Sequence, residues 1–107
     1  MTGEASFAKV FREGERFEAR HVRLIATPAK GTVGRVGFVI GKRELKLAVD
    51  RNYARRLMRE AVRLRRPGIE RFDIVLRLRS PCERADLAEL GSEAATVLDA
   101  LLKSRAP

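Results

Sequence analysis

The sequence predicts an α+β fold, a compact single-domain α/β sandwich formed by residues 1–107. A chain of 107 residues of which 45% are hydrophobic can bury one modest core, which favours one domain over two. Three segments carry apolar residues at helical spacing, and three others alternate apolar and polar residues as strands do. The predicted order is helix, strand, strand, helix, strand, helix.

The first predicted element is a short helix in the stretch "SFAKVFREG". Phe7, Val10 and Phe11 stand at positions i, i+3 and i+4, so they share one face of a helix. Ser6 suits the N-cap position and Gly14 ends the segment.

Two strands follow, in "ARHVRLIAT" and "RVGFVIG". Their apolar residues alternate with other side chains, and the stretch "PAKGTVG" between them carries Pro28, Gly31 and Gly34 as turn residues. We expect the two strands to pair antiparallel through a loop longer than a tight hairpin.

The segment 51–66 contains seven arginines and is predicted to be a helix. On a wheel of about 100° per residue, six of these arginines and Asn52 share one arc. A continuous apolar arc lies opposite; it consists of Tyr53, Ala54, Leu57, Met58, Ala61, Val62 and Leu64. Asp50 suits the N-cap or the first turn, and Pro67-Gly68 stops the helix.

A third strand and a last helix complete the chain. In "GIERFDIVLRLRSP", four apolar residues from Phe72 to Leu78 alternate with a face that carries Arg77 and Arg79, and Pro81 ends the strand. Residues 81–90 are expected to form a loop or a loose helical turn. Apolar residues at helical spacing then predict a helix over about 92–103.

The charge of the chain favours an anionic partner. The formal net charge is +9 and the sequence pI is close to 11.0. A helix face selected only for solubility would mix signs, whereas Glu60 is nearly the only counter-charge within residues 51–66. A polyanion-binding surface is therefore favoured, with an ordinary solvated helix face as the alternative.

Several functions are disfavoured by what the sequence lacks. It shows neither a secretory signal nor a long apolar run, so we expect a cytoplasmic protein with no membrane partner. His21 is the only histidine and Cys82 the only cysteine, which argues against a zinc site. With no local hydrolytic motif or phosphate-binding loop, the chain is not expected to be an enzyme by itself, and a basic RNA-binding protein of the ribosomal type is the main rival.

The order of residues in "GKRELKLAVDRNYARRLMRE" resembles the signature of the bacterial ribonuclease P protein subunit. In that signature, a basic pair is followed by Ala-Val, an Arg-Asn-Arg triplet, a further basic pair and Arg-Glu. The resemblance extends over about residues 7–104. The matching positions are Lys42, Arg43, Ala48, Val49, Arg51, Asn52, Arg55, Arg56, Arg59 and Glu60.

The resemblance implies a fold and a function. Such proteins have a helix, three strands, the arginine-rich helix, another strand and a last helix, with a left-handed βαβ crossover. They bind a catalytic RNA, one protein per RNA, and the ribonucleoprotein removes the 5′ leader of precursor tRNA with Mg²⁺. The RNA performs the chemistry, so the protein would hold neither a catalytic residue nor a metal site of its own.

The resemblance also assigns residues to two surfaces. A cleft between the first helix and the sheet would bind the leader, with Phe7 and Phe11 as stacking platforms and Arg23, Arg77 and Arg79 along the groove. The surface for the catalytic RNA would consist of Lys42, Arg43, Arg51, Asn52, Arg55, Arg56, Arg59 and Arg63.

Plainer alternatives exist, and the chain departs from the family twice. Phe7 and Phe11 stand at core spacing and could simply pack, and Asn52 could bond within its own helix. Tyr53 occupies the third place of the Arg-Asn-Arg triplet. The start "MTGEAS" lacks the basic segment usual in the family, which puts RNA contacts from an N-terminal arm in doubt.

Overall fold

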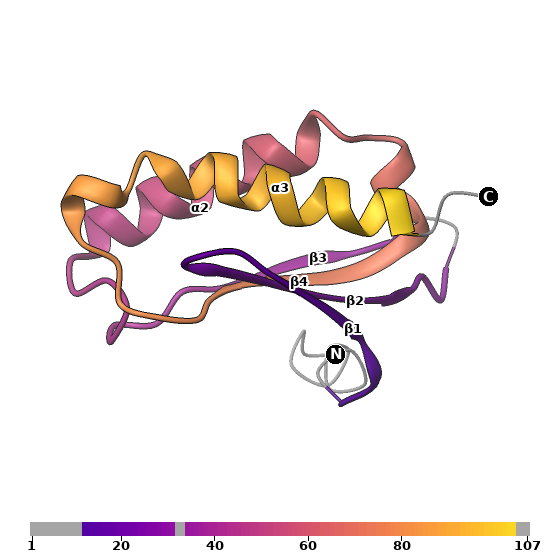
Figure 1. Ribbon diagram of the computed structural model, residues 1–107, viewed down its shortest axis with the longest axis horizontal. Coiled ribbons are helices and arrows are strands. Elements are labelled where there is room, and N and C mark those ends of the chain that lie inside the picture. The colour runs from indigo at the N-terminus through magenta and orange to yellow at the C-terminus, as the bar shows by residue number, and fades with distance from the viewer. Residues whose placement is uncertain (1–11, 32–33, 105–107) are drawn as a thin grey trace.

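The computed structural model describes residues 12–31 and 34–104. It has two layers, a four-stranded sheet and a pair of helices that cover one face of it (Figure 1). The elements in chain order are β1 (Glu15–Glu18), β2 (Val22–Pro28), β3 (Val36–Val39), α2 (Ala48–Arg63), β4 (Phe72–Leu78) and α3 (Glu89–Ser104), with short 3-10 turns at Gly68–Arg71 and Arg84–Asp86. This α+β arrangement confirms the predicted fold class.

The strand order β1-β2-β4-β3 shows that the predicted pairing of β2 with β3 was wrong. Strand β4 lies between them and pairs antiparallel with β2 and parallel with β3. The physical reason is burial: every residue of β4 except Arg77 is buried, and a strand that is buried on both faces belongs at the centre of a sheet. Strand β1 pairs antiparallel with β2 at the other edge.

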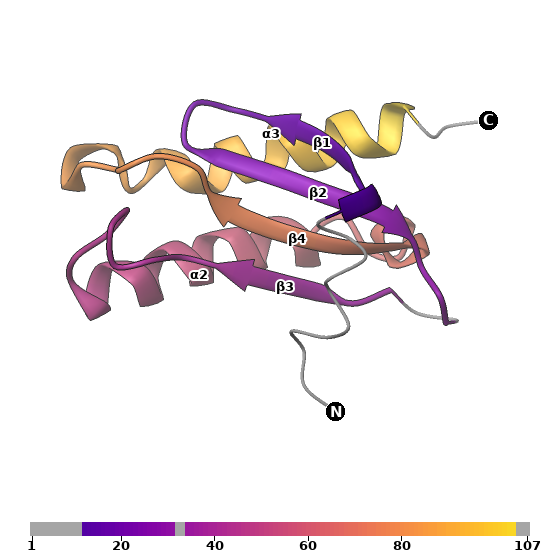
Figure 2. The same cartoon turned by 90° about the horizontal axis from the view of Figure 1, so that it is seen from below.

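The β3-α2-β4 connection is a left-handed crossover. Figure 2 shows the sheet from the side away from the helices; β3 and β4 point the same way and α2 lies behind them. In this view both strands point to the left and β4 lies above β3. The chain leaves β3, passes behind the sheet through α2 and returns in β4, which is a left-handed turn. Nearly all such connections in proteins are right-handed, so this is a distinctive feature, and it is the one that the resemblance implied.

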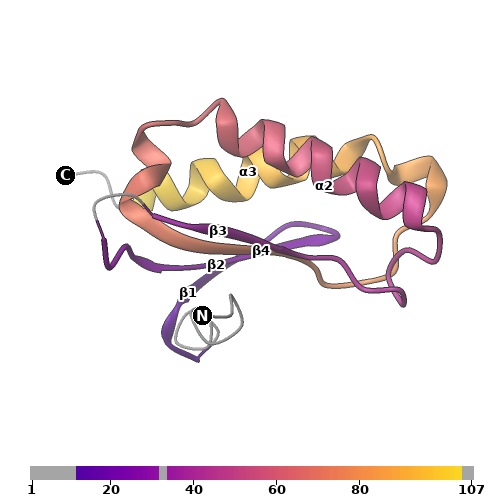
Figure 3. The ribbon, with the colours of Figure 1, turned by 180° about the vertical axis from the view of Figure 1, so that it is seen from behind.

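The core fills the space between the helices and one face of the sheet. Apolar residues of β2 and β4 meet those of the helices there; Leu24, Ile74, Leu76, Met58, Leu90 and Leu98 are among the fully buried ones. The two helices run side by side, as Figure 3 shows from behind. Gly91 of α3 faces Leu57 of α2, and a methyl group at Gly91 would lie 3.5 Å from Cβ of Leu57, an ordinary van der Waals distance.

Helix α2 is shifted toward the N-terminus relative to the prediction. It begins at Ala48 and ends at Arg63, and Asp50 lies in the first turn and not at the N-cap. The early end leaves three residues of turn before Pro67, which agrees with the steric conflict between proline and a preceding helical residue. Leu64, which the wheel places on the apolar side, is therefore 63% exposed.

The sequence did not predict β1, it predicted the last helix with a later start, and the first predicted helix lies largely outside the described residues. Strand β1 was not predicted from its residues, because "ERFE" contains a single apolar side chain. The last helix begins at Glu89, slightly earlier than expected, after a loop with one helical turn. The predicted first helix falls largely outside the described residues; Arg12 and Glu13 at its end are helical and Gly14 follows them.

Candidate nucleic-acid interface

The outward face of α2 gathers the arginines that the sequence places on one arc. Arg51 lies at its start, and its guanidinium donates to the carbonyl oxygens of Leu45 (2.8 Å) and Lys46 (2.9 Å). This side chain therefore fixes the loop that precedes the helix. Arg51 thus has a structural role in addition to its predicted role in RNA binding.

Asn52, Arg55 and Arg56 form the next part of this face. Arg55 donates to Oδ1 of Asn52 at 3.0 Å, so the amide holds the guanidinium in place on the surface. Arg56 is exposed, and within the part of the chain that the structure describes its side chain has no hydrogen bond or ion pair. Neither arginine has a carboxylate partner there, and their charge faces solvent.

Arg59 and Arg63 continue the face toward the end of the helix. The guanidinium of Arg59 lies over the ring of Phe38, 5.7 Å from its centroid. Arg63 donates through Nε to Glu60 at 3.0 Å. This hydrogen bond lowers the pKa of Glu60 and raises the pKa of Arg63, so both groups stay ionised and partly cancel.

Lys42 and Arg43 lie in the turn between β3 and α2. Backbone N–H groups of Glu44 and Leu45 donate to the carbonyl of Gly41, and the carbonyl of Glu44 accepts from Cys82. Both basic side chains are exposed. The turn thus presents two more cations close to the first turn of α2.

The arginines predicted to bind the leader lie on the opposite face of the sheet. Arg23 of β2 and Arg77 of β4 are direct cross-strand neighbours. Glu18 accepts from Nε of Arg23 at 2.6 Å and lies 3.3 Å from Arg79, and the hydrogen bond from Arg23 is the main reason that its pKa is lowered. Phe7 and Phe11 lie outside the described residues.

Arg77 differs from its neighbours on this face. Its Nε is buried and, among the described residues, has no hydrogen-bond partner. Beside it Ile25 and Val75, a cross-strand pair on the same face, are almost fully buried. This face therefore joins an apolar centre to three arginines, and the predicted site residues fall into two groups on opposite sides of the sheet.

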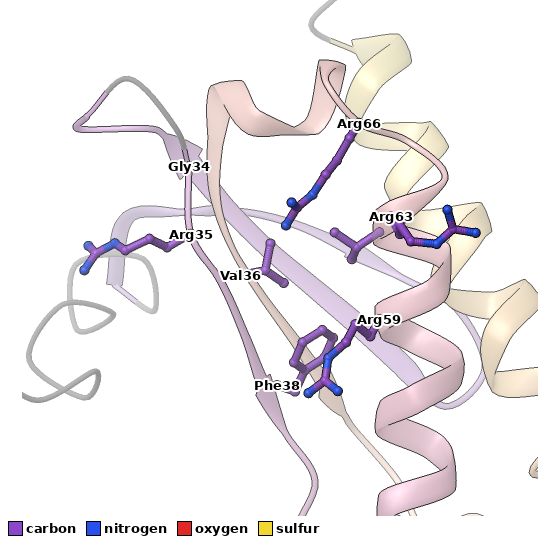
Figure 4. Close-up of a pocket in the computed structure, with 8 residues that line it drawn as sticks. Gly34, Arg35, Val36, Phe38, Arg59, Arg63 and Arg66 are labelled. Atoms are coloured by element: carbon purple, nitrogen blue, oxygen red, sulfur yellow. The ribbon is translucent and has the colours of Figure 1, made fainter.

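Residues that the sequence analysis did not assign also shape the surface. Phe38 and Arg66 line a groove between β3 and α2 (Figure 4), and neither was named as a site residue. Arg66 could have been assigned from the sequence, because it lies on the arginine arc of the helical wheel. Phe38 could not be identified from the sequence, because its ring is accessible only as a result of β3 being an edge strand of the sheet.

His21 and Cys82 belong to the structure of the core. His21 is buried, with Nδ1 2.8 Å from a carboxylate oxygen of Glu93, whose other oxygen accepts from the backbone N–H groups of His21 and Val22. Burial raises the pKa of the Cys82 thiol, so the thiolate is disfavoured.

The described residues hold no cluster of candidate metal ligands. They contain no group of three or more carboxylate, histidine or cysteine side chains close enough to share a metal ion. Asn52 offers one amide oxygen, which already accepts from Arg55. In the same part of the chain, no helix has both the length and the apolar character that a membrane crossing requires.

Known proteins share this sequence pattern and fold. The profile of the Ribonuclease P family matches residues 1–102. The ribonuclease P protein component of Nitrosomonas europaea is 36% identical over 88 residues, which cover 82% of this chain and 74% of that protein. That of Paraburkholderia xenovorans is 38% identical over 98 residues, 92% of this chain and 68% of the relative.

Solved structures agree on the fold. The ribonuclease P protein of Staphylococcus aureus superposes with a TM-score of 0.80 at 22% identity, over 94% of this chain and 93% of that one. The protein from Thermotoga maritima gives a TM-score of 0.72 at 22% identity, over 100% and 97% of the two chains. At this identity the structures support the fold alone, whereas the profile and the curated relatives show that the chain belongs to the ribonuclease P protein family.

Proposed function

We propose that the chain acts as the protein subunit of a ribonucleoprotein by binding its catalytic RNA through the outward face of α2 and the turn before it. The main support for this proposal is the arrangement of Arg55, Arg56 and Arg59. They follow one face of a helix, and no carboxylate partner binds them within the described residues. Guanidinium groups suit phosphate oxygens because their planar fork donates two parallel hydrogen bonds.

Residue roles on this surface differ. Lys42, Arg43, Arg56 and Arg59 would contact phosphates directly, and Asn52 would hold Arg55 for the same purpose. Arg51 would act mainly by fixing the loop that carries the basic turn. Arg63 would contribute less, since Glu60 offsets its charge.

The opposite face of the sheet would bind the 5′ leader of precursor tRNA. Arg23, Arg77 and Arg79 lie on that face, and their guanidinium groups would pair with phosphates of the leader. Phe7 and Phe11 would supply stacking platforms, which tolerate any base and so suit leaders of differing sequence. Two faces on opposite sides of one sheet would let the protein hold the catalytic RNA and the substrate at once.

The RNA would perform the cleavage, with one protein per RNA, in the cytoplasm. Mg²⁺ would be held by RNA phosphates, whose oxygen atoms are the kind of ligand that this ion prefers. The protein's contribution would be binding and orientation. The family match favours this role over that of a ribosomal RNA-binding protein, which was the rival interpretation.

Reconstitution with the cognate RNA tests the proposal. At low Mg²⁺, adding the full chain should raise the rate of leader removal from a precursor tRNA and strengthen substrate binding. The double variant Arg55→Ala/Arg59→Ala should lose most of this effect while its thermal unfolding stays unchanged. If the wild-type protein alters neither cleavage nor substrate affinity, the proposal is lost.

A further inference from the structure

We propose that the groove between β3 and the C-terminal half of α2 binds one unpaired nucleotide of RNA, with its base on Phe38 and its phosphate at Arg66. The inference deepens the proposed RNA-binding function and rests on it. The groove lies on the helix side of the sheet, so it is separate from the face that carries Arg23 and Arg77.

The groove has the size of a small-ligand site. Its volume is about 720 Å³, within the usual range of roughly 300–1,000 Å³ for such sites. The residues that line it include four arginines and no carboxylate; they are Gly34, Arg35, Val36, Phe38, Arg59, Val62, Arg63 and Arg66. Its walls are therefore cationic and its floor apolar.

The floor exists because β3 is an edge strand. Phe38 belongs to a cross-strand row in which Leu24 and Leu76 are fully buried, but among the described residues no further strand pairs with β3 on its outer side. The ring is consequently only partly buried and lies beside Val36 (Figure 4). A partly accessible aromatic ring next to a guanidinium is a platform on which a base can stack.

Gly34 keeps the upper end of the groove in its present shape. Its backbone N–H donates to the carbonyl of Glu70 at 2.6 Å, and an added Cβ would lie only 1.7 Å from the carbonyl oxygen of Phe72. Any side chain here would force β3 away from the start of β4. The spacing of the two groove walls thus depends on a glycine.

Two arginines are placed to hold a phosphate. Figure 4 shows Arg66 reaching into the groove from the turn after α2 and Arg59 above Phe38, whereas Arg63 and Arg35 point away from it. Arg66 is only loosely paired, with Nε 4.0 Å from Glu70 and more than half of its side chain exposed. A phosphate oxygen could replace that weak contact.

The combination selects an unpaired nucleotide over other ligands. The carboxylates of an acidic peptide would pair with Arg59 and Arg66 but would not stack on the ring of Phe38. The bases of a duplex are stacked and paired, so they do not reach a ring on the floor of a groove. Since Arg59 belongs to both the α2 face and the groove, a strand bound along α2 could place a splayed-out base there.

Crosslinking of a short RNA to the full chain can locate such a base. A single-stranded RNA hexamer containing 4-thiouridine should crosslink, on irradiation, within the tryptic peptide 36–42, which contains Phe38. Phe38→Leu should lower that crosslink and the affinity by about 10-fold, the effect of losing one stacked base. Arg66→Gln should weaken binding and reduce the salt dependence by roughly one phosphate contact.

Matched controls separate stacking from folding and from charge. Phe17 sits in the same cross-strand row at the opposite sheet edge, so Phe17→Leu makes the same replacement away from the groove and should leave crosslinking at 36–42 unchanged. Arg71→Gln is the charge control for Arg66→Gln and should leave that crosslink unchanged. Thermal unfolding of all four variants reports whether each folds, and Phe38→Tyr, which keeps the stacking ring, should restore crosslinking if Phe38→Leu is unstable.

Three outcomes would overturn the groove proposal. The first is crosslinking confined to peptides of the opposite sheet face, and the second is an unchanged crosslink at 36–42 in Phe38→Leu. The third is that a hexaglutamate peptide displaces the RNA hexamer equally well from the wild-type protein and from Phe38→Leu. Binding of the full catalytic RNA is measured in parallel: if it persists, only the groove proposal fails, and if it is absent, the proposed function fails as well.

Discussion

Helices α2 and α3 are alike in length and place but opposite in charge. Each has 16 residues, and the two lie side by side on the same face of the sheet. Each also buries an apolar stripe in the core between the helices and the sheet. Yet α2 carries five arginines against Asp50 and Glu60, whereas α3 carries three carboxylates against Lys103.

The difference lies in where the charged groups point. Two carboxylates of α3 bind within the protein: Glu93 holds the N-terminal end of β2, and Asp99 accepts from Arg65 at 2.8 Å. Arg65 is the one arginine of residues 51–66 outside the predicted arc. The arginines of α2 mostly face solvent, so α3 contributes to the structure and α2 presents a surface for a polyanion.

Removing positive charge from α2 should have the largest effect on RNA binding. We expect Arg55→Gln/Arg56→Gln/Arg59→Gln to weaken binding of the catalytic RNA on the order of 100-fold at physiological salt, as for the loss of three phosphate contacts. Filter binding or fluorescence anisotropy measures this directly.

The same change of net charge on α3 is the control. Ser92→Glu, Thr96→Glu and Lys103→Gln together also lower the net charge by three, at exposed positions. This variant should bind RNA within about threefold of wild type, because charges beyond roughly 8 Å of the RNA are screened at this salt. Equal losses in the two variants would refute the contrast between the helices.

Loss of Glu93 should affect stability and not RNA affinity. Glu93→Ala leaves two backbone N–H groups near the start of β2 without their acceptor, so we expect the free energy of unfolding to fall by about 2 kcal/mol. Glu89→Ala, at an exposed position in the first turn of the same helix, should cost only about 0.5 kcal/mol. Urea unfolding measures both, and a comparable cost for the two would mean that Glu93 is not a structural anchor.

Removing the counter-charge of α2 should have the smallest effect and the opposite sign. Glu60→Gln frees Arg63 from its carboxylate partner, and we expect RNA affinity to rise about two- to threefold, as is usual for an exposed ion pair. Titration of the catalytic RNA with this variant checks the sign. Weaker binding would show that the Glu60 carboxylate positions Arg63 for the RNA.

The sequence predicts this molecule well where a pattern is local. The period of 3.6 sorts residues 51–66 into an arginine arc and an apolar arc, and Ala54, Met58, Ala61 and Val62 are indeed buried. Alternation likewise identifies β2, β3 and β4. Such patterns hold because each residue's environment follows from its place on its own element.

Features that join distant parts of the chain were beyond the local patterns. Alternation shows that β2 and β3 are strands but not which strand lies between them, so their pairing was predicted wrongly. The groove at Phe38 follows from that same strand order. The bond between Glu93 and His21 joins residues 72 positions apart, and nothing near either residue indicates it.

The salt dependence of RNA binding tests the central claim most directly. If the α2 face contacts on the order of five phosphates, a fourfold rise in salt should weaken wild-type binding about 100-fold. The α2 triple glutamine variant should lose most of this dependence, while the α3 variant of equal net charge keeps it. A shallow slope for the wild type, or the same slope for all three proteins, would contradict the account.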